Sequence, residues 1–220
     1  MISGHKRQLG GALRCAILLF ALLMGPMPVR GAVGMRGQQY YVICAACHGE
    51  RAEGIEALGA PRLSQLPVSY LVRQLENFRH GRRGSHADDS FGQQMALVAA
   101  MIPDEDVERS VAEYIQGLRG EPPQEDKRRI GEGNPAAGQD AFKVCVACHG
   151  DRAQGIEQMD APPLSGQSAT YLVRQLEKFA TSRRGRAPDD APGARMASIA
   201  AAVDAKTSAE DLIAYISSLD

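Results

Sequence analysis

The sequence predicts an all-α chain in which one helical domain occurs twice in tandem. Sliding the chain along itself by 101 residues aligns GQQYYVICAACHGERAEGIE (37–56) with GQDAFKVCVACHGDRAQGIE (138–157) without a gap. Further along, YLVRQLENF (70–78) aligns with YLVRQLEKF (171–179). Apolar residues recur at helical spacing within each copy, and no segment alternates convincingly as a strand. A duplicated all-α fold is therefore expected.

Three helices are expected in each copy. A short helix leads into the cysteine motif, and the repeated YLVRQLE segment forms the second. The last begins after Pro103 in the first copy and at Ser208 in the second, where a near capping box marks its start. Gly- and Pro-rich loops are expected between these helices.

The N-terminus reads as a secretory signal peptide over residues 1–34. A basic stretch precedes the apolar run CAILLFALLM (15–24), which is too short for the roughly 20 residues of a spanning helix. Cleavage is expected near 31–34, after Gly31 or Gly34. The first domain then covers 35–118 and the second 134–220. The charged, Pro- and Gly-containing segment 119–133 reads as a linker.

The charge balance excludes one class of partner. The chain carries 25 Lys and Arg against 26 Asp and Glu, and four of the basic residues lie in the leader, which has no acidic residue. The remaining body is mildly acidic, whereas nucleic-acid binding requires a clustered basic face. No nucleic-acid partner is therefore expected.

Every cysteine outside the leader belongs to a CxxCH motif, which is typical of covalent haem c attachment. Two cysteines three apart can each form a thioether to one haem vinyl group, and the adjacent histidine then faces the iron. Two motifs at equivalent positions predict two covalently bound haem c groups. The attachment residues are Cys44, Cys47, Cys145 and Cys148, and the proximal iron ligands are His48 and His149.

Three other interpretations of the cysteines compete. Paired CxxC elements of a zinc site are usually 15–20 residues apart, whereas these lie about 100 apart. Structural disulfides suit an oxidising compartment, but they would leave both adjacent histidines as a coincidence. A thioredoxin-like redox motif would accompany a βαβ pattern, which the sequence lacks.

The second axial ligand decides between electron transfer and small-molecule chemistry, because an open iron position binds a reactant. A ligand that both copies need should recur at the fixed offset. Met95 recurs as Met196, whereas His80, His86 and Met101 have no equivalent. We therefore expect Met95 and Met196 as distal ligands, in a stretch approaching the last helix, although methionine also serves as core filler.

Two further groups are candidates for contact with each cofactor. A proximal histidine usually donates its other ring N–H to a carbonyl, and Pro61 and Pro162 each follow a haem histidine by 13 residues. Arg73 and Arg174 are candidates for pairing with haem propionates, as are Arg82 and Arg183. Solvated arginines would explain the latter four equally well.

With its two CACHG sites, Pro-x-Leu-Ser loops, Tyr-Leu-Val-Arg-Gln-Leu helices and paired methionines, the chain from about Gly37 to Leu219 resembles cytochrome c4. The resemblance implies two tandem class I cytochrome c domains, each wrapped around one haem. It also implies a periplasmic electron carrier, soluble or loosely associated with the membrane, whose partners are redox proteins and whose acceptor is often a terminal oxidase. The segments before the last helices depart from the family pattern.

The resemblance implies a carrier with no catalytic residues, and two other functions compete with it. The chain is also similar in layout to the cytochrome subunit of an oxidoreductase complex, such as a flavocytochrome sulfide dehydrogenase. A dihaem peroxidase would need one open iron position, and equal methionines in both copies argue against it.

Overall fold

The computed structural model describes residues 1, 30–121, 133–204 and 208–219. Residues 2–29, which hold most of the predicted signal peptide, and 122–132, which hold most of the predicted linker, lie outside the described residues. The described residues from Gly34 onward form one compact unit. Among the described residues, no helix is both long enough and apolar enough to span a bilayer.

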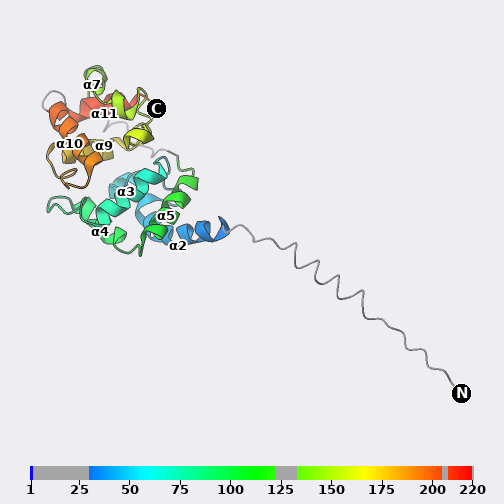
Figure 1. The fold of residues 1–220 in the computed structure, drawn as a ribbon. Helices are drawn as coiled ribbons and strands as arrows, with labels where there is room; N and C mark the ends of the chain where they lie inside the picture. The colour runs from blue at the N-terminus through cyan, green and yellow to red at the C-terminus, as the bar shows by residue number, and fades with distance from the viewer. Residues whose placement is uncertain (2–29, 122–132, 205–207, 220) are drawn as a thin grey trace. The chain divides into compact units, whose positions relative to one another are not determined.

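The all-α prediction is confirmed for the described residues, in which the only β pairing consists of two isolated bridges (Figure 1). The first half contains α2 (Arg30–His48), the 3-10 helix η1 (Glu56–Leu58), α3 (Val68–Arg79), α4 (Ser90–Ala99) and α5 (Glu105–Gly117). The second half contains α7 (Pro135–Phe142), α8 (Val146–His149), η2 (Glu157–Met159), α9 (Ala169–Ala180), α10 (Ala191–Asp204) and α11 (Ala209–Ser217).

The first and last helices of each half cross at a glycine. A Cβ atom on Gly37 of α2 would lie 2.1 Å from the carbonyl oxygen of Ser110 in α5. A Cβ atom on Gly138 of α7 would lie 2.0 Å from the carbonyl oxygen of Asp211 in α11. Both distances are far inside van der Waals contact, so the crossing requires glycine at these two positions.

The helices α4 and α10 occupy a stretch that the sequence analysis assigned to loops. Asp89 caps α4 by accepting a hydrogen bond from the Gly92 amide at 2.8 Å, and Asp190 caps α10 by accepting one from Gly193 at 3.1 Å. These helices were missed because they begin at Gly-containing sequences and lack a regular apolar stripe. The difference matters because α4 carries Met95 and α10 carries Met196.

Each half has its own hydrophobic core, in which equivalent residues occupy equivalent places. Val111 and Ile115 of α5 are buried with Leu75 and Phe78 of α3. In the second half, Leu212 and Ile216 of α11 are buried with Leu176 and Phe179 of α9. The cores therefore follow the sequence repeat.

Among the described residues, the first half contains an ion pair with a buried carboxylate that has no equivalent in the second half. The Glu108 side chain is 0% exposed, and its Oε1 lies 3.3 Å from Nε of Arg79. Burial raises the pKa of the Glu108 carboxyl, although Arg79 opposes this rise. The equivalent residues in the second half are Ala180 and Ala209, which shows that the same packing accommodates small apolar side chains.

We predict that Gly37→Ala and Gly138→Ala each lower the free energy of unfolding by about 1–3 kcal/mol, as overpacking at a close contact does. Gly117→Ala is the matched control, because a Cβ atom there meets nothing within 4 Å. Urea titration of the holoprotein checks this prediction. It fails if Gly37→Ala and Gly117→Ala have the same effect.

We also predict that Arg79→Ala costs about 3–5 kcal/mol, because it leaves a buried carboxylate unpaired, whereas Arg79→Ala/Glu108→Ala costs less. The native protein holds the Glu108 proton more tightly than the unfolded chain does. The contribution of Glu108 to stability is therefore greatest below the ordinary glutamate pKa of 4.5 and declines as pH rises through its higher native value.

The free energy of unfolding of Arg79→Ala/Glu108→Ala, relative to that of the parent, should therefore rise as pH increases from below 4.5 through the higher native pKa of Glu108. Urea unfolding at a series of pH values measures the difference. A flat difference, or one that falls with pH, would contradict the prediction.

Candidate functional site

Two large pockets lie among the described residues, and we call them the first-half pocket and the second-half pocket after the half that supplies most of each lining. Their volumes, including solvent at the mouth, are about 1170 Å³ and 1330 Å³. Each is lined by the two cysteines, the histidine and the recurring methionine of its own half. The structure thus brings together the residues that the sequence analysis selected as thioether sites and axial ligands.

The cysteine motifs lie in and beside the helices that end at the histidines. Helix α2 contains Cys44 and Cys47 and ends at His48, while Cys145 immediately precedes α8, which contains Cys148 and ends at His149. Burial raises the pKa of the Cys44 and Cys145 thiols to about 11.

The zinc-site alternative does not match the arrangement of the described side chains. In the part of the chain that the structure describes, no group of three or more His, Cys, Asp or Glu side chains is arranged to hold a metal ion. The four free thiols instead line pockets whose other residues are mainly apolar. This setting fits covalent attachment of a large apolar cofactor.

Both histidine rings are held by a backbone carbonyl. Nδ1 of His48 lies 2.9 Å from the carbonyl oxygen of Pro61, and Nδ1 of His149 lies 2.9 Å from that of Pro162. A carbonyl oxygen only accepts hydrogen bonds, so each Nδ1 carries the proton and each Nε2 keeps its lone pair. Burial lowers the pKa of both imidazoles and so favours this neutral form, which binds metals.

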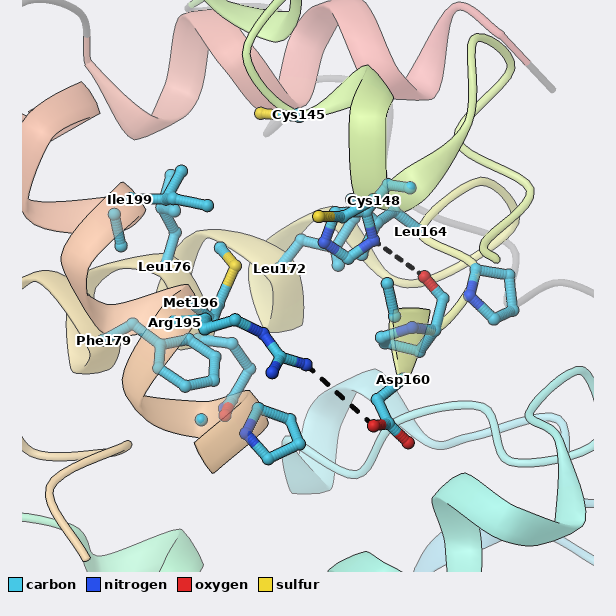
Figure 2. Close-up of a pocket in the computed structure, with 18 of the residues that line it drawn as sticks. Cys145, Cys148, Asp160, Leu164, Leu172, Leu176, Phe179, Arg195, Met196 and Ile199 are labelled. Atoms are coloured by element: carbon cyan, nitrogen blue, oxygen red, sulfur yellow. Dashed lines mark hydrogen bonds and ion pairs between the residues drawn. The ribbon is translucent and has the colours of Figure 1, made fainter. Parts of the chain in front are cut away.

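The methionines reach the pockets from other helices. Met95 in α4 and Met196 in α10 are both half-buried in the pocket linings. Figure 2 shows Met196 and Cys148 on different walls of the second-half pocket, with Leu172, Leu176 and Phe179 among the apolar residues around them. Met159 also lines this pocket, but its equivalent in the first half is Leu58.

Two buried arginines that the sequence analysis did not single out lie on the pocket linings, Arg83 in the first half and Arg184 in the second. Arg83 donates to Tyr171 and Gln175 at 3.0 Å, and Arg184 donates to Tyr70 at 3.1 Å. Within the described residues, neither guanidinium forms an ion pair with a carboxylate. Buried cations of this kind fit a cofactor that carries its own carboxylates, as haem does through its propionates.

The four arginines that the sequence analysis proposed have different surroundings. Arg73 lines the second-half pocket and pairs with Asp160, while Arg174 lines the first-half pocket and donates to the carbonyl oxygen of Gly59 at 2.6 Å. Each therefore reaches the pocket of the other half. Neither Arg82 nor Arg183 lines either of these two pockets.

The sequence matches the cytochrome c family over residues 34–119 and 135–220. A thiosulfate dehydrogenase electron acceptor from Stutzerimonas stutzeri is 34% identical over 68% of this chain and 68% of that protein. Cytochrome c4 from Pseudomonas aeruginosa is 30% identical over 77% of this chain and 81% of that protein. Both similarities extend over most of the two repeats.

Two solved structures resemble the fold. Reduced cytochrome c4 from Pseudomonas stutzeri superposes with a TM-score of 0.61 at 25% identity, covering 84% of this chain and 95% of that one. The thiosulfate dehydrogenase TsdBA from Marichromatium purpuratum superposes with a TM-score of 0.61 at 28% identity, covering 83% of this chain but only 39% of that one.

The tandem pockets, the two CxxCH motifs and the family match lead to one conclusion. The chain belongs to the cytochrome c family and is a cytochrome c4-like electron-transfer protein with two covalently bound haem c groups.

Proposed function

We propose that this chain is an exported periplasmic carrier that passes single electrons between respiratory redox proteins and catalyses no substrate chemistry of its own. One observation carries the proposal: in both halves, the pocket lining includes an oriented neutral histidine and a methionine from a different helix. A histidine and a methionine that both held the haem iron would leave no position on it for a reactant.

The protein's residues set the conditions for this role. When bound, haem iron supplies a one-electron change between the ferric and ferrous states. The Pro61 and Pro162 carbonyls orient the two imidazoles. The Met95 and Met196 thioethers would favour the ferrous state of a bound haem, and the apolar linings would do the same because they penalise the extra charge of ferric iron.

The redox partners are proposed from the relatives. One relative is named as the electron acceptor of thiosulfate dehydrogenase, and another, 31% identical over 66% of this chain and 48% of that protein, is a subunit of a cbb3-type cytochrome c oxidase from Bradyrhizobium diazoefficiens. We therefore propose a dehydrogenase as electron donor and a terminal oxidase as acceptor. The proposal includes loose association with the membrane.

A second candidate function is that of a cytochrome subunit within an oxidoreductase complex. The similarity to TsdBA favours thiosulfate dehydrogenase over the flavocytochrome sulfide dehydrogenase that the sequence analysis considered. Size-exclusion chromatography of a mixture with purified thiosulfate dehydrogenase separates the two functions. A stable complex supports the subunit role, whereas separate elution with rapid electron transfer supports the carrier.

We predict that Met95→Ala and Met196→Ala each remove about half of the weak long-wavelength absorption band of methionine-ligated ferric haem. Each variant should also bind cyanide rapidly at one haem. Met101→Ala is the control, because Met101 is 62% exposed and lines neither pocket. An unchanged band in both pocket variants, or rapid cyanide binding by the parent, would refute the ligation and with it the carrier role.

A further inference from the structure

The two halves differ in charge at one buried position of their mutual contact. Lys178 of α9 is 5% exposed and forms an ion pair with Asp89, which is 3% exposed and lies in the other half. The equivalent of Lys178 in the first half is Asn77, which is also buried. The equivalent of Asp89 is Asp190, which forms no ion pair within the described residues. At this pair of equivalent positions, only the second half therefore carries a lysine.

Lys178 belongs to the second half but lines the first-half pocket, as Asp89 does. Asp89 also caps α4, the helix that carries Met95. Burial disfavours the Asp89 carboxylate, but the hydrogen bonds from Lys178 and from the Gly92 amide outweigh it and lower the carboxyl pKa. Asp89 is therefore ionised at neutral pH. Burial lowers the pKa of the Lys178 ammonium, and the hydrogen bond to the Asp89 carboxylate opposes this fall.

The other charges on the two linings do not cancel this difference. The first-half pocket has three cations and one anion besides its histidine, and the second-half pocket has three cations and two anions. These are Arg83, Asp89, Arg174 and Lys178 in the first, and Arg73, Asp160, Arg184, Asp190 and Arg195 in the second. Asp160 and Arg195 are the most exposed of these side chains, so solvent screens them most. When Asp160 and Arg195 are left out of the count, the lining of the first-half pocket is still more positive than that of the second-half pocket by one charge.

We propose that Lys178 sets the order of the two reduction potentials, so that the haem of the first half accepts the first electron. A cation in a medium of low dielectric constant disfavours the additional positive charge of ferric iron. The half-reduced protein then holds its electron in the first half, and internal electron transfer runs from the second half to the first. The inference rests on the proposed function, since it requires a one-electron haem in each half.

The experiment exchanges the two equivalent residues in the holoprotein. Lys178→Asn places the first-half residue in the second half, and Asn77→Lys makes the reciprocal change. Lys178→Arg keeps the charge. Each protein is titrated potentiometrically while proton NMR follows the axial methionine methyl signal of each haem, and the Met95→Ala and Met196→Ala variants assign these signals to the two halves.

In the parent, the Met95 signal should report the higher midpoint potential. Lys178→Asn should lower that midpoint and shift the Met196 midpoint less, while Asn77→Lys should raise the Met196 midpoint. Lys178→Arg should retain the parental order. A lysine that only holds the two halves together would leave the order and the separation of the two midpoints unchanged in Lys178→Asn, and that result would overturn the proposal.

Two other results would also overturn the inference: a lower midpoint for the first half in the parent, or equal shifts of both midpoints in Lys178→Asn. If Lys178→Asn does not fold, the parental order and the Asn77→Lys shift still decide. If both methionine signals are present but the Met196 signal reports the higher midpoint, this inference is refuted and the proposed function is not. Missing methionine signals would instead refute the proposed function.

Discussion

The hydrogen bond between each haem histidine and a proline carbonyl is the interaction on which both sites depend. It ties the end of the helix that carries the histidine to the loop that follows, and it fixes which ring nitrogen is free. Burial then keeps the ring neutral. The attachment cysteines are the neighbours of this ring in sequence, so orienting the ring also orients the bonds that hold the cofactor.

Features that depend on short spacing could be predicted from the sequence. Two CxxCH motifs, the proline 13 residues after each histidine and a methionine that recurs at the same offset select the residues that line each pocket. The repeat was the strongest guide, because it separated Met95 and Met196 from methionines and histidines without an equivalent. The all-α class followed from the apolar spacing of three helices per copy.

Features that depend on the contact between the halves could not be predicted in this way. Three cationic side chains each line the pocket of the half to which they do not belong: Arg73, Arg174 and Lys178. No local sequence pattern indicates that these side chains extend into the other half. Arg83 lies beside Arg82 in the repeated Arg-Arg-Gly segment, and recurrence alone does not show which of the two is buried. The helices α4 and α10 were missed because packing against the pocket, rather than an amphipathic stripe, determines their position.

The shared wall between the pockets has a consequence for how the duplicated chain can change. Leu66, Tyr70, Gln74, Tyr171 and Gln175 line both pockets. A substitution at any of these five positions alters two cofactor environments at once, so the copies are not free to diverge there independently. Divergence is easier at positions that border one pocket only, such as Lys178, which borders the first-half pocket and not the second. The two haem domains therefore share five pocket residues, and neither domain can change them without changing the pocket of the other.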